Sequence, residues 1–63
     1  MTGDALKTLR LQAGLTQQQV ADLAGWNHRV IVSALEKRAN VPPGSASRYV
    51  EALAKHAGDV KGG

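Results

Sequence analysis

Glycine and proline positions set the strongest limit on the fold, because they keep every helix-forming segment short. Gly14 and Gly25 stand where a left-handed residue would end a helix, and Pro42 and Pro43 cannot donate the N–H that a helix interior requires. Apolar residues recur at helical spacing in the four segments that remain, residues 3–13, 16–24, 27–38 and 45–57. The chain is therefore predicted to be all-α, a compact bundle of four or five short helices.

Composition narrows the class of protein. With 63 residues, no cysteine and two histidines, the chain is expected to be one domain over residues 1–58 with a short flexible tail at 59–63, and to have no metal site and no cofactor. No apolar run is long enough to span a bilayer, and no signal peptide is recognisable. A cytoplasmic protein without membrane contact is therefore expected. No catalytic motif is present, so an enzyme is not expected. Eight Lys and Arg against five Asp and Glu, with a pI near 9.8, favour a polyanionic partner.

Helix start signals are clearest at the second segment. Thr16 followed three residues later by Gln19 predicts a capping box, and Leu15 with Val20 predicts a hydrophobic staple. The N-caps expected for the other three segments are Thr2 or Asp4, Asn27 and Ser45.

The second and third segments together form a candidate helix-turn-helix at about residues 16–38. A short helix, a turn that contains Gly25 and a second helix are the arrangement that places the second helix in the major groove of DNA. The pattern by itself is equally consistent with an ordinary helical hairpin in a four-helix bundle.

The residues between Gly14 and Gly25, GLTQQQVADLAG, resemble the G-L-T-Q-x-x-L-A-x-x-x-G signature of Cro/CI-type regulators, the XRE family. The resemblance covers about residues 5–54 and implies a lambda-repressor-like DNA-binding domain. It implies a transcriptional regulator, most simply a repressor that occludes a promoter, bound to a palindromic operator in double-stranded DNA as a homodimer that forms in solution or only on DNA. No small-molecule ligand is expected, and the location would be a bacterial cytoplasm or nucleoid, or a phage-infected host.

One departure from the family pattern affects the contacts that read bases. Gly25 and Glu36 are eleven positions apart, against about ten in the family, so one residue is added near the turn. If the third helix is aligned with the family pattern by its C-terminal end, the residues directed to the bases are Arg29, Val30 and Ala34. If it is aligned by its N-terminal end, they are His28, Arg29 and Val30. Asn27 could reach a base edge or a phosphate. The side chain of Val30 is equally consistent with core packing.

The remaining site residues are assigned to phosphates or to support of the fold. The start of the second helix attracts phosphate through its unpaired N–H groups, and basic or polar residues follow the third helix. The expected phosphate contacts are Thr16, Gln17, Gln18, Lys37, Arg38 and Asn40. By resemblance, Arg10 and Glu36 pair across the first and third helices, whereas Lys7 and Arg48 are interpreted as ordinary surface charges.

A second hypothesis comes from a different class of protein. The helix-turn-helix could serve only as a scaffold in a protein-interaction module, antitoxin-like or an accessory subunit, that binds its partner through the fourth helix. An exposed stripe of Tyr49, Leu53 and His56 would favour that hypothesis, whereas burial of Val50, Leu53 and Ala57 would leave little surface for a protein partner.

Overall fold

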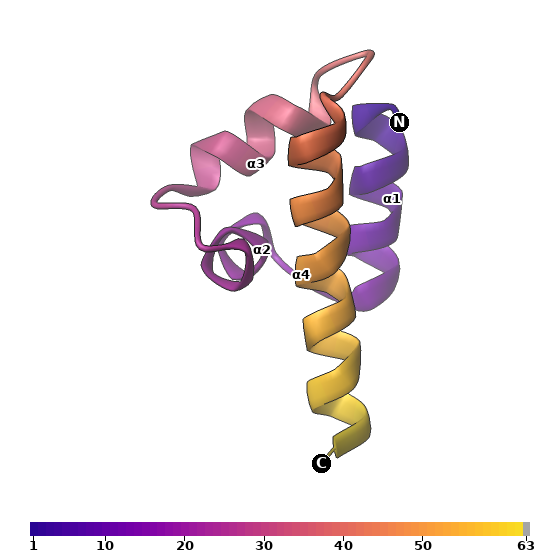
Figure 1. The fold of residues 1–63 in the computed structure, drawn as a ribbon, viewed down its shortest axis with the longest axis vertical. Coiled ribbons are helices and arrows are strands. Elements are labelled where there is room, and N and C mark those ends of the chain that lie inside the picture. The colour runs from indigo at the N-terminus through magenta and orange to yellow at the C-terminus, as the bar shows by residue number, and fades with distance from the viewer. Residues whose placement is uncertain (63) are drawn as a thin grey trace.

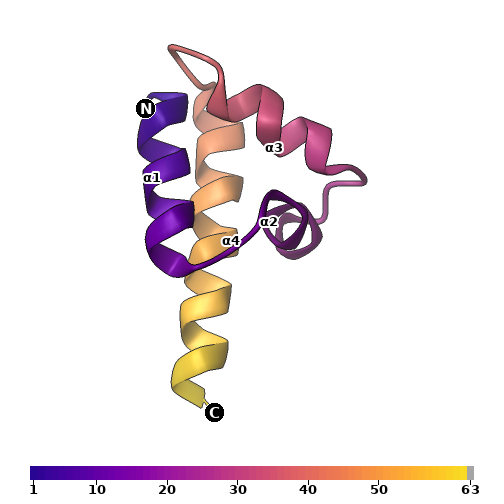
Figure 2. The same ribbon diagram turned by 180° about the vertical axis from the view of Figure 1, so that it is seen from behind.

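The computed structural model describes the backbone of residues 1–62 and the side chains of residues 1–58. The helices in this range are α1 (Gly3–Ala13), α2 (Gln17–Ala24), α3 (Arg29–Glu36) and α4 (Pro43–Gly62). Helices α1 and α4 lie side by side and run in the same direction, while α2 and α3 pack against them on one side (Figure 1, Figure 2). The all-α fold class is confirmed. Within the described range, no helix is long and apolar enough to cross a bilayer.

A single apolar core joins the four helices. Its buried side chains are Leu6, Leu15, Val20, Ala21, Val32, Leu35, Val41, Tyr49 and Ala52. The ring of Tyr49 is fully buried and lies 6.5 Å from the ring of Trp26, so Trp26 packs the turn between α2 and α3 against α4. Small residues such as Ala21 let the helices approach closely, which is how so short a chain can bury a continuous core.

The limits of α1 and α2 follow the sequence signals. Thr2 rather than Asp4 caps α1, with its hydroxyl accepting a hydrogen bond from the Ala5 N–H at 3.1 Å. Both helices end at glycines in the left-handed region, Gly14 at φ 73° and Gly25 at φ 78°. A side chain is strained at such a φ, so glycine is the residue that can end each helix there.

Helix α3 begins one residue later than the sequence indicates. The predicted N-cap, Asn27, is wrong: His28 occupies that position, and its side chain makes no capping hydrogen bond. The reason lies in the turn, where the Trp26 N–H still bonds to Ala21 O at 2.9 Å and the extra residue delays the return to helical geometry until Arg29. The predicted end at residue 38 is also too late, since α3 ends at Glu36.

Helix α4 is longer than predicted at both ends. It begins at Pro43, not after Ser45, because proline is well suited to a first helical position, where the missing N–H would have no partner anyway. The Ala46 N–H donates to Pro42 O at 2.9 Å and closes its first turn. It continues to Gly62 because Gly58 does not adopt the positive φ that ends α1 and α2. Only Gly63 of the predicted tail lies wholly outside the described residues.

Candidate nucleic-acid interface

The N-terminus of α2 is held in a fixed conformation by the capping box that the sequence predicts. The Gln19 N–H donates to Thr16 Oγ1 at 3.1 Å, and the Thr16 N–H donates to Gln19 Oε1 at 2.8 Å. The following N–H groups of the first turn, those of Gln17 and Gln18, cannot be satisfied within the helix. Together with the positive end of the helix dipole they make this terminus suited to a phosphate oxygen.

Helix α3 separates its residues cleanly into two faces. Val32, Leu35 and Glu36 are buried against the other helices. The opposite face is exposed over Arg29, Val30 and Ala34. Val30 is 67% exposed, which excludes the core-packing interpretation of this side chain. His28, in the turn before the helix, is exposed as well, so the residues of both alignments are accessible to a partner.

Glu36 joins all four helices through one buried cluster of hydrogen bonds. Its Oε2 accepts from Arg10 Nε of α1 at 2.7 Å and from the Tyr49 hydroxyl of α4 at 2.6 Å. Its Oε1 accepts from Arg10 Nη2 at 3.2 Å and from Gln17 Nε2 of α2 at 3.2 Å. Arg10 also donates through Nη1 to Leu15 O at 2.8 Å. The structure thus contains the Arg10–Glu36 pair, and adds Tyr49 and Gln17 to it.

The cluster changes the acidity of its members. Burial alone would raise the pKa of Glu36, but hydrogen bonds from Arg10, Tyr49 and Gln17 outweigh it and lower that pKa below the ordinary value. The hydrogen bond with Glu36 raises the pKa of Arg10, and burial together with the Glu36 carboxylate raises the pKa of Tyr49. The ion pair therefore stays charged and the phenol neutral around neutral pH.

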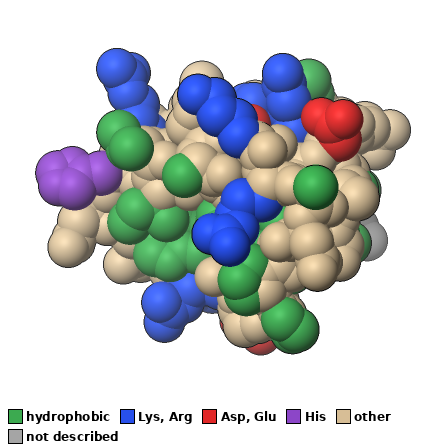
Figure 3. All heavy atoms as spheres, turned by 90° about the horizontal axis from the view of Figure 1, so that it is seen from above, with side chains coloured by type: hydrophobic (Ala, Val, Ile, Leu, Met, Phe, Trp, Pro, Cys, Tyr) green, Lys and Arg blue, Asp and Glu red, His purple; other side chains and the backbone are tan. Residues whose placement is uncertain are grey.

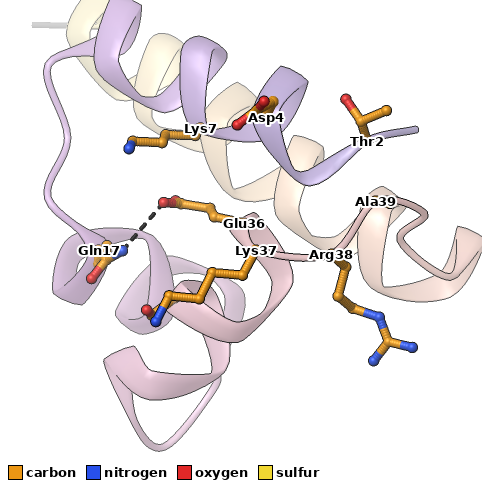
Figure 4. Close-up of a pocket in the computed structure, with 9 residues that line it drawn as sticks. Thr2, Asp4, Lys7, Gln17, Glu36, Lys37, Arg38 and Ala39 are labelled. Carbon is orange, nitrogen blue, oxygen red and sulfur yellow. Dashed lines mark hydrogen bonds between the residues drawn. The ribbon is translucent and has the colours of Figure 1, made fainter.

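Two hollows flank Gln17 and gather most of the expected contacts. One, of about 560 Å³, brings Thr16, Gln17 and Gln18 of the α2 terminus together with Arg29 of α3. The other, of about 570 Å³, lies between α1 and α3 and is lined by Gln17, Lys37 and Arg38 (Figure 4). A single continuous surface thus contains both the helix terminus suited to phosphate and the exposed face of α3.

The expected contacts that fall outside the two hollows are also exposed. His28 and Asn27 lie in the turn before α3, and Val30 and Ala34 lie on α3 itself. Asn40 lies in the loop between α3 and α4 and lines neither hollow. Viewed from the end that carries α3, the molecule shows Lys and Arg side chains spread over the surface, with hydrophobic side chains exposed between them (Figure 3).

Sequence reasoning missed two residues of this surface, Lys7 and Ser33. Lys7 of α1 is an exposed charge, as the sequence indicates, and it also lines the same hollow as Gln17, Lys37 and Arg38 (Figure 4). Its spacing was the available signal, because it lies three residues before Arg10 and therefore on the side of α1 that meets α3. Ser33 lies one turn after Arg29 on the edge of the exposed face.

Charge across this surface is predominantly positive. The hollow between α1 and α3 is lined by the cations Lys7, Lys37 and Arg38 and by the exposed carboxylate of Asp4. The carboxylate of Glu36 in the same hollow is already paired with Arg10. In the described part of the chain, no three side chains of the metal-ligating types come together. The surface is thus built to attract an anion through cations and a helix terminus.

Comparison with known proteins gives one match. A family model described as a helix-turn-helix domain matches residues 3–58, which include α1, α2, α3 and most of α4. No curated protein and no solved structure matches the chain significantly.

Proposed function

The chain belongs to the helix-turn-helix domain family, in its XRE/Cro-like type, and is a DNA-binding regulator; we propose that it recognises a specific palindromic operator as a homodimer and represses by occluding a promoter. In this proposal the protein acts by binding alone, without catalysis. The observation that carries the proposal is the single surface on which the α2 terminus and the exposed face of α3 meet.

The proposed docking places α3 in the major groove. Arg29 can bond the O6 and N7 atoms of guanine together through its planar fork. The α2 terminus then meets the backbone beside the groove, where Gln17 and Gln18 bind phosphate. The Gln17 amide nitrogen donates one of its two N–H groups to Glu36, so its other amide N–H and its backbone N–H are the donors left for a phosphate oxygen. Lys37 and Arg38 contact the flanking backbone.

A dimer is supported by a third hollow, at the start of α4, which shares no lining residue with the two hollows that flank Gln17. Met1 is 55% exposed and Val50 39% exposed, and they line a shallow hollow of about 420 Å³ with Pro43 and Ala46. Two subunits joined there, or elsewhere on α4, would present two recognition helices about 34 Å apart on one side of the DNA. The stripe proposed for a protein partner is not exposed as a whole, because Tyr49 is fully buried.

The test is selection of bound sequences from a random double-stranded DNA pool at about 150 mM salt, where nonspecific phosphate attraction is weak. We expect enrichment of a palindrome whose half-sites are about 10 base pairs apart. The same selection with Arg29→Ala, which retains the buried cluster, should enrich sequences that share a weaker base preference. Absence of any enriched sequence, with binding that vanishes as salt rises, would contradict the proposal and favour a protein-interaction module.

A further inference from the structure

Helix α3 carries an apolar stripe on the face that it turns to solvent. Val30 is 67% exposed, Ile31 is 38% exposed, and Ala34 is exposed one turn later. The buried face of the same helix already contributes Val32 and Leu35 to the core, so the stripe is not needed for packing within the chain. Leaving Val30 in water forgoes the stabilisation that burial of such a side chain provides.

Cations and a helix terminus surround the stripe. Arg29 precedes Val30 directly, Lys37 follows Ala34 by one turn, and the N-terminus of α2 shares a hollow with Arg29. A partner for this surface must therefore combine negative charge at its edges with an apolar centre. The DNA major groove has that combination, because phosphates line its edges and the C5-methyl groups of thymine project from its floor.

We propose that Val30 and Ala34 read the C5-methyl groups of thymines in each half-site, next to the base pair that Arg29 contacts. The inference rests on the proposed sequence-specific DNA binding and names which base feature the stripe recognises. Val30 and Ala34 are four residues apart, which is about 6 Å along a helix and close to two base-pair steps of about 3.4 Å. The thymines read by the two side chains therefore lie within about two base pairs of each other.

The test replaces thymine by uracil, which removes only the C5-methyl group. After selection has identified the operator, each thymine of one half-site is replaced in turn and the dissociation constant is measured. We expect one or two positions at which the replacement weakens binding about fourfold, the factor that corresponds to one buried methyl group. The other thymines should show no change.

Protein variants then connect the effect to the stripe. Val30→Ala removes two methyl groups from an exposed position, where folding is not affected, and should reduce the thymine-to-uracil effect at one position to less than about twofold. Leu9→Ala is the control, since Leu9 is an exposed apolar residue of α1 that lines none of the hollows described above and should leave the effect at every position unchanged. Circular dichroism of both variants checks that the fold is retained.

The outcomes separate this inference from the proposed function. A selected operator without thymine in the half-sites, or with thymines that uracil replaces without loss, would overturn the reading of methyl groups and leave the regulator in place. An effect that Val30→Ala does not reduce would overturn the role of Val30. Failure of the selection to enrich any sequence would overturn the proposed function, and this inference with it.

Discussion

Arg29 is the residue whose chemistry distinguishes base reading from phosphate binding most directly. It is exposed at the first position of α3 and lines the hollow at the α2 terminus. If it bonds guanine, Arg29→Ala should cost about 1 to 3 kcal/mol on the selected operator and relax the preference at one position. Arg48→Ala, an exposed arginine on α4, is the control that should change neither quantity. The affinity of each variant for a library of operator sequences distinguishes base reading from phosphate binding. If Arg29→Ala leaves the sequence preference unchanged, Arg29 does not read a base.

The lowered pKa of Glu36 predicts that the free energy of unfolding depends on pH in the acid range. The pKa of this carboxyl is lowered in the folded state, so its contribution to stability is fully present above the ordinary pKa of 4.5. As the pH falls below that value the unfolded state takes up the proton first, and the free energy of unfolding should decrease. Urea unfolding between about pH 7 and pH 3 measures the loss, and the carboxyl carbon shift of Glu36 measures its pKa. Titration of Glu36 at or above 4.5 would contradict the arrangement in the buried cluster.

The C-terminal end of α3 and the loop after it are held by the first residues of the chain, Met1 and Gly3. The Gly3 N–H donates to Arg38 O at 2.8 Å, and the Val41 N–H donates to Met1 O at 2.9 Å. A Cβ at Gly3 would lie 2.4 Å from the backbone oxygens of Leu35 and Glu36, a contact that backbone must move to relieve. Helix α3 is therefore held at its C-terminal end by close backbone contact, and at Glu36 by the buried cluster.

Gly3→Ala tests this contact. The substitution should lower the free energy of unfolding by about 1 to 3 kcal/mol, as overpacking in a tight site does. Gly44→Ala is the matched control: a Cβ there meets nothing within 4 Å, and alanine should stabilise α4 by up to about 1 kcal/mol. Thermal unfolding of both variants gives the comparison. A neutral Gly3→Ala would show that α1 can shift away from α3 without loss.

Elements whose limits depend on local chemistry were predictable from the sequence. The capping box at Thr16 and the left-handed glycines after α1 and α2 act within a few residues, and the structure has them where the sequence indicates. The start of α3 was not predictable, because it depends on how the longer turn packs Trp26 against α4. The bond from Gln17 to Glu36 and the position of Lys7 arise between helices distant in sequence, which periodicity does not describe.

Across the whole molecule, the net charge of +3 is distributed unevenly among surfaces with different roles. Lys7, Lys37 and Arg38 lie around the hollow between α1 and α3, while Lys55 lies exposed on α4. A cation that neutralises a phosphate releases a counterion, so the salt dependence of binding counts such contacts. The arrangement predicts that the cations near α3 contribute to this count and that Lys55 does not.

Lys37→Ala should therefore weaken binding to every DNA sequence alike and reduce the slope of log K against log salt by about 1. The selected site should remain the same, because a phosphate contact carries no base information. Lys55→Ala removes the same charge from α4 and should leave the slope unchanged, which separates a local contact from the effect of net charge. Equal slopes for the two variants would mean that the molecule attracts DNA only through its total charge. The cations near α3 would then make no specific contact with the DNA backbone.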